Sequence, residues 1–288
     1  MEVSGRTGLL GLIGTPIGHS GSPAMYNYSF ELLDMDYKYL AFDIKLDEVA
    51  NAISAIKTFK MKGANVTMPC KGAVCEYMDE LSPAARIIGA CNTIVNENGK
   101  LTGHITDGQG YVRNLKENGV DVKGKKLTIM GAGGAATAIQ VQCALDGARE
   151  ISIFNKKDDF FQRAEKTVED IKKEVPNCIV NLYDLDDTEK LYAEISDSDI
   201  LTNATIVGMK PYENDTNILD TNVFRKDLVV TDVVYNPIKT TMILEAEKAG
   251  CKVIGGKGML LYQGVEAFKL FTGKDMPVKE VKAKYFAE

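Results

Sequence analysis

The sequence predicts an α/β protein built from two domains. The chain has 288 residues, which is enough for a large core and about two domains. Apolar runs of strand length alternate with helix-like runs along most of the chain, a pattern that favours parallel sheets. Between Lys125 and Asp158 the chain reads as strand, glycine-rich turn, helix and strand, which is the order of a βαβ unit.

The glycine-rich turn carries the pattern Gly131-x-Gly133-x-x-Ala136, the fingerprint of a dinucleotide-binding Rossmann domain. Gly131 permits the tight turn, Gly133 lets the backbone approach a pyrophosphate, and the small Ala136 lets the helix pack close to the strand. The helix N-terminus adds free N–H groups and partial positive charge. Glycine-rich turns also occur in other α/β proteins, but here the strand and the helix flank the turn in the required order. We therefore expect a dinucleotide to bind at this turn.

The first part of the chain alternates strand and helix and has a hairpin near its end. Ser22 before Pro23 predicts a helix start with Ser22 as the N-cap. The run Asn96-Glu-Asn-Gly99 predicts the turn of the hairpin. The expected elements are, in order, strand 9–13, the helix from Ser22, strand 37–44, helix 46–60, strand 63–68, helices 72–81 and 83–88, and hairpin strands 92–95 and 100–104.

The alternation continues through the rest of the chain. A helix over 108–118 leads out of the first domain, and the βαβ unit follows it. The later elements are expected to be, in order, helix 158–175, strand 179–185, helix 188–195, strands 199–205 and 228–235, helix 242–249, strand 251–254 and helix 258–271.

Composition and charge exclude several classes of partner. The formal net charge is −6 and no basic block is present, so neither nucleic acid nor an anionic membrane surface is expected as a partner. The N-terminus lacks a basic region followed by an apolar run, and no stretch approaches ~18 apolar residues. We therefore expect neither a signal peptide nor a spanning helix, and a cytoplasmic protein.

Cysteine and histidine usage argues against a metal site. The six cysteines form no C-x-x-C pair, so we expect small buried hydrophobic side chains in a reducing compartment, with neither a disulfide framework nor a zinc site. The two histidines are His19 and His104, and a histidine-based metal cluster or catalytic triad needs one of them. We expect no metal, and acid–base chemistry carried by other residues.

Unusual polar residues follow several predicted strands, where ligands of parallel sheets bind. Ser20 and Ser22 stand at a helix N-terminus that favours an anion such as a carboxylate, although Ser22 alone is explained as an N-cap. Lys71 follows strand 63–68, where it serves as a desolvated base, as a charged donor, or only as a surface lysine. Asp107 lies in a glycine-rich bend, where it either shares proton transfer with Lys71 or caps the next helix.

The adenosine end of the dinucleotide site reads Asn155-Lys156-Lys157-Asp158. An acidic residue at this strand end binds the ribose 2′-hydroxyl of NAD, whereas basic residues favour the 2′-phosphate of NADP. Asp158 also has the simpler interpretation of a helix cap. Both features side by side suggest that NAD and NADP are both accepted.

Taken together, these residues resemble the shikimate dehydrogenase family over nearly the whole chain. The motifs are, in order, Pro16-Ile-Gly-His-Ser-Gly-Ser-Pro23, Asn65-Val-Thr-Met-Pro-Cys-Lys71, Gly89-Ala-Cys-Asn-Thr93, Thr106-Asp-Gly108, Gly131-Ala-Gly-Gly-Ala-Ala136, Asn203-x-Thr205, Val234-Tyr-Asn-Pro237 and Gly258-Met-Leu-Leu-Tyr-Gln263. Each motif is modest, but their order and spacing together are specific. Within the family, Asn155-Lys-Lys-Asp-Asp-Phe-Phe161 is similar to the quinate/shikimate dehydrogenase branch, which accepts NAD or NADP.

The resemblance implies a role for each matching residue. Ser20 and Ser22 are implied to hold the substrate carboxylate, and Lys71 with Asp107 to form the acid–base pair. The residues implied to hold the ring hydroxyls are Thr67, Lys71, Asn92, Asp107 and Gln263. The residues implied to bind the cofactor are Gly131, Ala132, Gly133, Gly134 and Ala135 at the pyrophosphate, Asn155, Lys156 and Asp158 at the adenosine ribose, Val233, Tyr235 and Gly256 near the nicotinamide, and Thr205.

The resemblance also implies the domain organisation. A catalytic, substrate-binding domain is expected to combine residues 1–107 with 259–288, and a Rossmann NAD(P)-binding domain to span 108–258, with a cleft that opens and closes.

Two single residues and one residue pair depart from the family pattern. Ile105 replaces the asparagine that usually precedes Thr-Asp-Gly, and Ile206 stands where the dual-cofactor branch can carry a lysine. The pair Lys156-Lys157 replaces arginines, which predicts weaker bidentate and stacked contacts to a 2′-phosphate and adenine.

The leading hypothesis is an NAD(P)-dependent oxidoreductase that interconverts shikimate and 3-dehydroshikimate and, in one branch, quinate and 3-dehydroquinate. Such an enzyme serves aromatic amino acid (chorismate) biosynthesis or quinate use, works on a small molecule, and is expected as a monomer or homodimer. One alternative is a non-catalytic nucleotide-sensing protein on the same scaffold, which intact Lys71 and Asp107 disfavour. Another is a folate or amino-acid dehydrogenase of similar architecture, which the paired serines and Gln263 disfavour.

Overall fold

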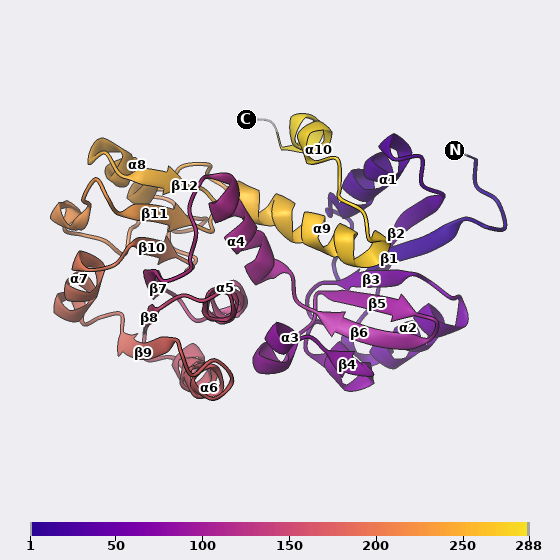
Figure 1. Cartoon of the computed structure of the whole chain (residues 1–288), viewed down its shortest axis with the longest axis horizontal. Helices are drawn as coiled ribbons and strands as arrows, with labels where there is room; N and C mark the ends of the chain where they lie inside the picture. Colours follow the sequence, from indigo (N-terminus) through magenta and orange to yellow (C-terminus); the bar gives the residue numbers. More distant parts are fainter. Residues whose placement is uncertain (1, 287–288) are drawn as a thin grey trace. The chain divides into compact units, whose positions relative to one another are not determined.

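The protein is described by a computed structural model that covers residues 2–286. The chain divides into two compact units, and strands alternate with helices in both (Figure 1). The first unit comprises Met1–Thr106 and Gln263–Glu288, and the second comprises Asp107–Tyr262. The domain boundaries expected from the sequence were placed nearby, after residues 107 and 258. Helix α9 (Lys257–Thr272) returns the chain from the second unit to the first.

The first unit is built on a mixed sheet with the strand order β2-β1-β3-β5-β6-β4. Its strands are β1 (Gly8–Gly14), β2 (Tyr37–Asp43), β3 (Gly63–Val66), β4 (Glu80–Leu81), β5 (Thr93–Glu97) and β6 (Lys100–His104). Strand β5 pairs antiparallel with both β3 and β6, whereas β1 is parallel to β2 and β3, and β4 is parallel to β6. The expectation of a parallel sheet is therefore wrong at β5, because the hairpin reverses the chain there.

The hairpin itself is confirmed. Glu97 pairs with Lys100, so that only Asn98 and Gly99 form the turn. Both have positive φ, at 56° and 97°, as a type I′ turn requires. The side chain of Asn96 stabilises the turn by accepting a hydrogen bond from the Gly99 N–H at 2.8 Å.

An aromatic cluster explains why the C-terminal segment completes the first unit. Its helices are α1 (Ser22–Leu32), α2 (Val49–Thr58), α3 (Pro83–Ile88), the end of α9 and α10 (Val278–Tyr285). Tyr26 of α1 stacks on Tyr39 of β2 with ring centroids 4.5 Å apart, and Phe268 of α9 lies 6.1 Å from Tyr26. Tyr26 Oη donates to the Gly264 carbonyl at 2.9 Å. Burial of these rings together fastens α9 to α1 and β2.

Two parts of the first unit differ from the sequence expectation. The segment 72–81 forms a 3-10 helix over Ala73–Tyr77 and the short strand β4. Asp79 accounts for the difference, because its N–H donates to the Leu101 carbonyl of β6 at 2.9 Å and its carboxylate accepts from the Leu101 N–H at 2.7 Å. The terminal helix α10 was not expected from the sequence.

The second unit is a doubly wound Rossmann domain. Its strands are β7 (Lys126–Met130), β8 (Glu150–Asn155), β9 (Ile179–Asp184), β10 (Ile200–Asn203), β11 (Val229–Asp232) and β12 (Lys252–Ile254). They are parallel throughout and follow the order β12-β11-β10-β7-β8-β9, so the direction of winding reverses between β7 and β10. This confirms the expected βαβ unit.

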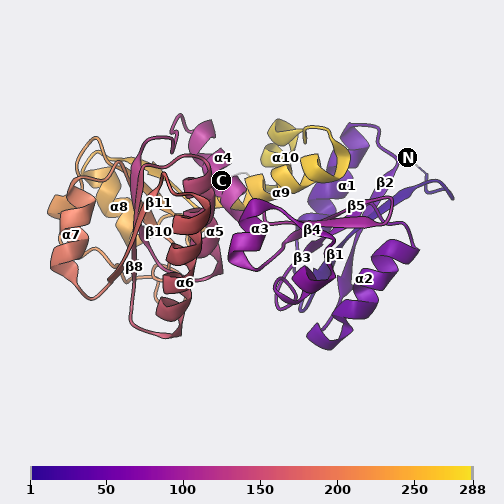
Figure 2. The same cartoon turned by 60° about the horizontal axis from the view of Figure 1, so that its bottom comes forward.

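Helices cover both faces of the second sheet. They are α4 (Asp107–Glu117), α5 (Gly134–Leu145), α6 (Asp159–Glu174), α7 (Thr188–Ser196) and α8 (Thr241–Lys248), together with the start of α9. Helices α5 and α6 lie on one side of the strands, and α7 and α8 lie on the other (Figure 2). All five residues of β7 are buried, as expected for a central strand covered on both faces.

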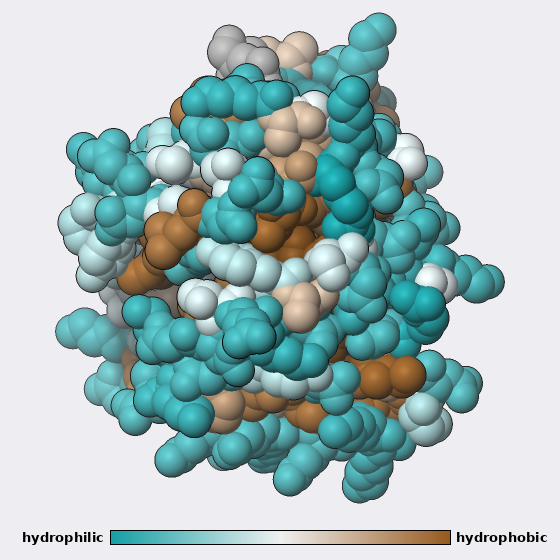
Figure 3. Space-filling view, turned by 90° about the vertical axis from the view of Figure 1, so that its left-hand side faces the viewer, coloured by the Kyte–Doolittle hydropathy of each residue, from teal (hydrophilic) through white to brown (hydrophobic). Residues whose placement is uncertain are grey.

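The surface fits the charge and composition of the chain. The face that carries α7 is mostly hydrophilic, with separate hydrophobic areas between polar side chains (Figure 3). Across residues 2–286, no helix combines the length and the apolar character needed to cross a bilayer. The same residues contain no group of three or more histidine, cysteine or acidic side chains arranged to hold a metal ion.

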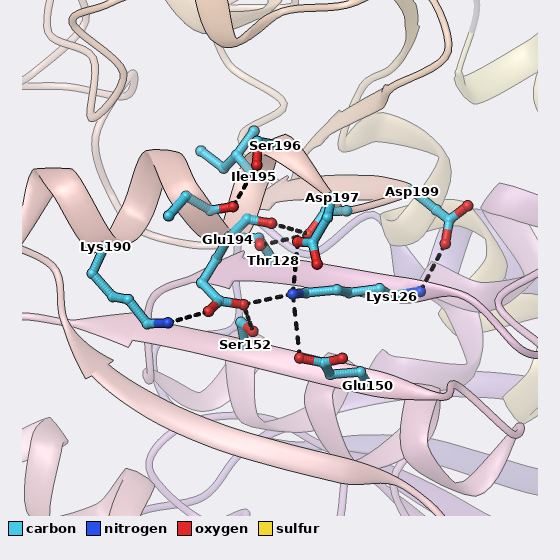
Figure 4. Close-up of polar contacts among 12 residues, drawn as sticks. Lys126, Thr128, Glu150, Ser152, Lys190, Glu194, Ile195, Ser196, Asp197 and Asp199 are labelled. Carbon is cyan, nitrogen blue, oxygen red and sulfur yellow. Dashed lines mark hydrogen bonds and ion pairs between the residues drawn. The ribbon is translucent and has the colours of Figure 1, made fainter.

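A buried lysine at the N-terminal edge of the second sheet holds three carboxylates. Lys126 Nζ lies 2.7 Å from Glu194, 2.7 Å from Asp197 and 3.2 Å from Glu150, and its side chain is only 5% exposed (Figure 4). Burial raises the pKa of Glu194, but hydrogen bonds from Lys126, Lys190 and a serine outweigh it and lower the pKa to about 2. The network ties β7 and β8 to α7.

Replacing Lys126 by methionine is expected to lower the free energy of unfolding by about 3 kcal/mol, because it removes this cation from the buried Glu194 and the partly buried Glu150. Urea unfolding measures the change. Lys125→Met is the matched control: Lys125 pairs with Asp199 at 2.9 Å but is 48% exposed, so its loss costs about 0.5 kcal/mol. Since the pKa of Glu194 is depressed, the difference should hold above pH 4.5 and shrink as the pH falls toward 2. Equal costs for the two variants would contradict this account.

Candidate functional site

Four polar segments meet at one edge of the first sheet. The loop with Ser20 follows β1, the segment Thr67–Lys71 follows β3, and Thr106 comes two residues after β6. These three strands point the same way, so their carboxyl ends share an edge. Asn92 reaches that edge from the opposite direction, because it precedes the antiparallel β5. The sheet therefore brings Ser20, Thr67, Lys71 and Asn92, which stand in separate motifs of the sequence, to the same edge.

A hydrogen-bond chain orients Asn92 at this edge. Tyr39 Oη donates to Asn65 Oδ1 at 2.8 Å, and Asn65 Nδ2 donates to the Asn92 carbonyl at 3.1 Å. Asn92 Oδ1 accepts from the Thr106 N–H at 2.9 Å, and Asn92 Nδ2 donates to Thr106 Oγ1 at 3.0 Å. Sequence reasoning missed the orienting role of Tyr39 and Asn65. The available signal was an asparagine inside an otherwise apolar strand.

The serine pair lies at the start of α1. The N-cap is Gly21 rather than Ser22, so the N-cap residue itself makes no side-chain hydrogen bond to the helix. Ser22 is the first helical residue, and its N–H donates to Ser20 Oγ at 3.3 Å. The expectation of Ser22 as N-cap is wrong, because the turn places Ser20 Oγ over the first backbone donor. Both serines are partly exposed, as an anion site at a helix N-terminus requires.

Lys71 and Gln263 are the remaining candidate site residues of the first unit. Lys71 is partly buried, and its carbonyl accepts a hydrogen bond from the Cys91 N–H at 2.8 Å. Gln263 is partly buried on α9, next to the glycine that anchors this helix on Tyr26.

Asp107 is the first residue of α4, which opens the second unit. The helix is anchored along its length. A Cβ built on Gly108 would lie 2.2 Å from the Ala138 carbonyl oxygen, so only glycine permits this close approach to α5. One turn later, Tyr111 Oη hydrogen-bonds to Thr202 Oγ1 at 2.7 Å and Thr231 Oγ1 at 3.0 Å. Sequence reasoning missed Tyr111, whose partners lie about a hundred residues away.

The glycine turn of the second unit lies where the winding reverses. Gly131 has φ +111°, and a Cβ there would lie 2.6 Å from the Ala204 carbonyl oxygen. Gln140 Nε2 donates to the Gly131 carbonyl at 2.9 Å and holds the turn. Built Cβ atoms on Gly133 and Gly134 meet nothing within 4 Å, so open space lies beside the backbone at the start of α5. Ala132 is buried and Ala135 is exposed.

The adenosine end is organised by Asp158, which caps α6. Its Oδ1 accepts from the Phe160 N–H at 2.9 Å and from Asn155 Nδ2 at 2.9 Å. The capping role is therefore confirmed, and one carboxylate oxygen is committed to it. Lys156 and Lys157 are exposed and face acidic residues at the end of β9, 3.7 Å from Asp186 and 3.6 Å from Asp184, respectively.

A buried carboxylate holds the loops after β10 and β11. Asp232 accepts hydrogen bonds from Asn203 Nδ2 at 3.0 Å, the Val234 N–H at 2.9 Å and Thr240 Oγ1 at 2.7 Å. Asn203 Oδ1 in turn accepts from Thr205 Oγ1 at 2.7 Å. This network positions Thr205 and the loop that contains residues 233–235.

The remaining cofactor candidates belong to these loops. A Cβ on Gly256 would lie 2.2 Å from the Val233 carbonyl oxygen, so these two backbone segments touch. Tyr235 and Ile206 are exposed at the same ends of the strands, and the exposed Ile206 occupies the position where a lysine was the family alternative.

Burial raises the pKa of Asp232 to about 6, although hydrogen bonds from Thr240, Val234 and Asn203 oppose the shift. The folded protein therefore holds this proton more tightly than the unfolded chain. The contribution to stability is complete below pH 3.8 and is lost as the pH rises through 6.

Asp232→Asn keeps the shape and cannot ionise, so it should gain stability relative to the parent protein as the pH rises from 4 to 7. Urea unfolding at four pH values tests this, with the exposed Asp227→Asn as the control. A stability difference that does not vary with pH would contradict the assignment.

Comparisons with known proteins agree with these two units. Residues 12–94 match the model of the shikimate dehydrogenase substrate binding domain, and residues 256–284 match that of the shikimate 5'-dehydrogenase C-terminal domain. The shikimate dehydrogenase (NADP(+)) of Listeria innocua is 52% identical over 281 residues, which cover 98% of this chain and 96% of that protein. That of Streptococcus uberis is 52% identical over 284 residues, with the same coverage.

Solved structures show the same similarity. Shikimate 5-dehydrogenase from Listeria monocytogenes, in complex with shikimate and NAD, superposes with a TM-score of 0.95 at 51% identity and covers 98% of both chains. Quinate dehydrogenase from Corynebacterium glutamicum, in complex with NAD, has a TM-score of 0.85 at 30% identity and covers 97% of this chain and 99% of its own.

Proposed function

Because the chain belongs to the shikimate dehydrogenase family, we propose that it transfers hydride reversibly between NAD(P) and the pair shikimate and 3-dehydroshikimate. The observation that carries the proposal is the gathering of Ser20, Thr67, Lys71 and Asn92 at one sheet edge of the first unit. The relatives that are 52% identical over nearly the whole chain are enzymes named for this reaction. They support an enzyme and not the alternative of a non-catalytic nucleotide sensor.

The first unit is the proposed substrate-binding domain. Ser20 and Ser22 are assigned to the substrate carboxylate, because their hydroxyls can donate hydrogen bonds and the N-terminus of α1 carries partial positive charge. Thr67, Asn92 and Gln263 are assigned to the ring hydroxyls. Asn92 has the clearest support, since its orientation is fixed through Asn65 and Thr106.

Lys71 and Asp107 are the proposed acid–base pair. During oxidation, the hydroxyl of the reacting ring carbon must lose a proton as hydride leaves the carbon. Lys71 is assigned to take that proton and to return it in the reverse direction. Asp107 is assigned to hold the ammonium group and the substrate hydroxyl, from a helix that Gly108 and Tyr111 anchor.

The second unit is the proposed cofactor domain, and its residues fit a nicotinamide dinucleotide. The open space beside Gly133 and Gly134, at the N-terminus of α5, suits a pyrophosphate. The cofactor supplies or accepts the hydride when it is bound. At the other end of the site, Thr205, Val233, Tyr235 and Gly256 are assigned to the nicotinamide side.

The residues at the adenosine end of the cofactor site suit both NAD and NADP. Asp158 uses Oδ1 for capping and retains its second oxygen for a ribose hydroxyl, while Lys156 and Lys157 can turn from Asp186 and Asp184 to a 2′-phosphate. Asn155 fixes the carboxylate of Asp158. The lysines bind a phosphate less tightly than arginines would, because they lack the planar bidentate fork.

Quinate and 3-dehydroquinate are a second proposed substrate pair. The support is the similarity to the quinate dehydrogenase from Corynebacterium glutamicum. We further propose a cytoplasmic monomer or homodimer that serves aromatic amino acid biosynthesis or quinate use. The six cysteines are all free thiols, as a reducing compartment favours.

The test is kcat/KM for the four pairings of shikimate or quinate with NAD⁺ or NADP⁺, followed by reduced-nicotinamide absorbance. Turnover of both acids, with NAD⁺ at least as good as NADP⁺, would make Asp158 the selector of the cofactor. Turnover of shikimate with NADP⁺ alone would confine Asp158 to its capping role. Absence of turnover in all four pairings would refute the proposed function.

A further inference from the structure

Two thiols face each other in the first unit. The Sγ atoms of Cys75 and Cys91 are 3.5 Å apart, within hydrogen-bond distance, and both thiols are free. Cys75 lies in the 3-10 helix Ala73–Tyr77 and is partly exposed, whereas Cys91 is fully buried. The two cysteines are 16 positions apart in the sequence, and this spacing does not predict that they form a pair.

Both cysteines converge on the backbone of Lys71. The Cys91 N–H donates to the Lys71 carbonyl at 2.8 Å. Cys75 Sγ lies 3.6 Å from the same carbonyl oxygen and its S–H can donate to it. Asn92 directly follows Cys91. The thiol pair is therefore built into the two segments that carry Lys71 and Asn92.

We propose that Cys75 and Cys91 are a modification site for hydroperoxide oxidants, at which a reversible disulfide lowers turnover by displacing Lys71. The consequence for turnover rests on the proposed function of Lys71, whereas formation of the disulfide does not.

The chemistry proceeds in two steps. The Cys75 thiolate attacks one peroxide oxygen, the O–O bond breaks, and Cys75 becomes a sulfenic acid as water leaves after protonation. The Cys91 thiol then attacks this sulfur, the S–S bond forms, and a second water leaves with the Cys91 proton. In sum, two thiols lose two electrons and two protons, and one hydrogen peroxide is reduced to two water molecules.

The environment separates the roles of the two thiols. The hydrogen bond from Cys91 lowers the pKa of Cys75, although burial opposes the shift, while the same interaction raises the pKa of Cys91. Cys75 is also the partly exposed member. Cys75 is therefore the thiol that reacts with the oxidant, and the buried Cys91 is the resolving thiol.

Closing the bond must move the segment that starts at Lys71. A disulfide requires the sulfur atoms to approach from 3.5 Å to about 2.05 Å. Cys91 is the more firmly held of the two residues, because its side chain is fully buried and its neighbour Asn92 is hydrogen-bonded to Thr106. The 3-10 helix with Cys75 must shift instead, and Lys71 lies just before it.

The experiment uses the full-length protein, first reduced with dithiothreitol and then treated with hydrogen peroxide. We expect loss of two free thiols, a peptide pair joined through Cys75 and Cys91 that is two hydrogens lighter, and a fall in shikimate turnover on the order of 100-fold. Dithiothreitol should restore activity, and the Kd of NADP⁺ should stay unchanged because the cofactor residues lie in the second unit.

Cys75→Ser should keep basal turnover and resist peroxide. Cys70→Ser is the matched control: Cys70 is buried, with Sγ 3.5 Å from the Ile44 carbonyl, and its variant should be inactivated like the parent protein. A protein with the mapped disulfide and full turnover would overturn the proposal, as would failure of the disulfide to form or inactivation of Cys75→Ser at the parent rate. If the reduced parent protein turns over no substrate, the proposed function fails, and the thiol count still decides whether the modification site exists.

Discussion

Replacing Lys71 by methionine is expected to lower kcat for shikimate oxidation by on the order of 10²- to 10⁴-fold, with little change in the Kd of NADP⁺. The magnitude is that of a general acid–base group removed from a reaction that must move a proton. Methionine keeps most of the length and packing of lysine, so the loss isolates the amine. Asp107→Asn should produce a loss in the same range, because it removes the carboxylate assigned to hold the ammonium group.

Steady-state kinetics and fluorescence titration of the cofactor separate the two effects. Lys62→Met is the matched control, because Lys62 is exposed immediately before β3 whereas Lys71 follows the other end of the same strand. It should leave kcat and Kd unchanged. Equal losses of turnover and cofactor affinity in Lys71→Met would mean that the chemistry has been assigned to the wrong residue.

Replacing Gly131 by alanine is expected to abolish cofactor binding and to destabilise the second unit by about 3 kcal/mol. The residue has φ +111°, which an L side chain rarely adopts, and the new Cβ would lie 2.6 Å from the backbone oxygen of Ala204. Neither the unfavourable φ nor the contact with the Ala204 oxygen can be relieved by a side-chain rotation. The turn and the segment after β10 would have to separate where the sheet reverses its winding.

Gly133→Ala is the informative partner of this variant. Gly133 has φ −71° and open space around its built Cβ, so stability should change by less than about 0.5 kcal/mol. The added methyl group would nevertheless occupy space that the pyrophosphate needs, and the Kd of NADP⁺ should rise. Urea unfolding and cofactor titration of both variants test this. Unchanged cofactor affinity in Gly133→Ala would place the pyrophosphate elsewhere.

Most of the fold could be predicted because its signals are local. The glycine turn, the Asn-Gly hairpin and the apolar strand runs depend on the conformations of neighbouring residues, and all three are present in the structure. The 3-10 helix and strand within 72–81 could not be predicted, because the pairing of Asp79 with β6 overrides helix propensity. The cap at Gly21 depends on where Ser20 Oγ points, which no propensity describes.

The candidate site divides in the same way. The residues that the proposed function assigns to the ligands stand in recognisable motifs beside strand ends. The family and the proposed set Ser20, Lys71, Asn92 and Asp107 could therefore be predicted from the sequence. The supporting residues are different in kind. Tyr39 and Tyr111 act through hydrogen bonds to residues far away in the chain, and their importance exists only once the strands are ordered.

The cysteines show most clearly how the fold brings distant residues together. The sequence predicts small buried hydrophobic side chains at these positions, and four of the six cysteines are indeed buried without a thiol neighbour described within hydrogen-bond distance. Cys75 and Cys91 differ from the other four. Strand β5 runs antiparallel beside β3, and this places Cys91 in hydrogen-bond contact with the backbone of Lys71. Local sequence predicts most of the helices and strands. The order of the strands in a sheet determines which distant side chains come into contact, and the proposed reactivity of the thiol pair depends on such a contact.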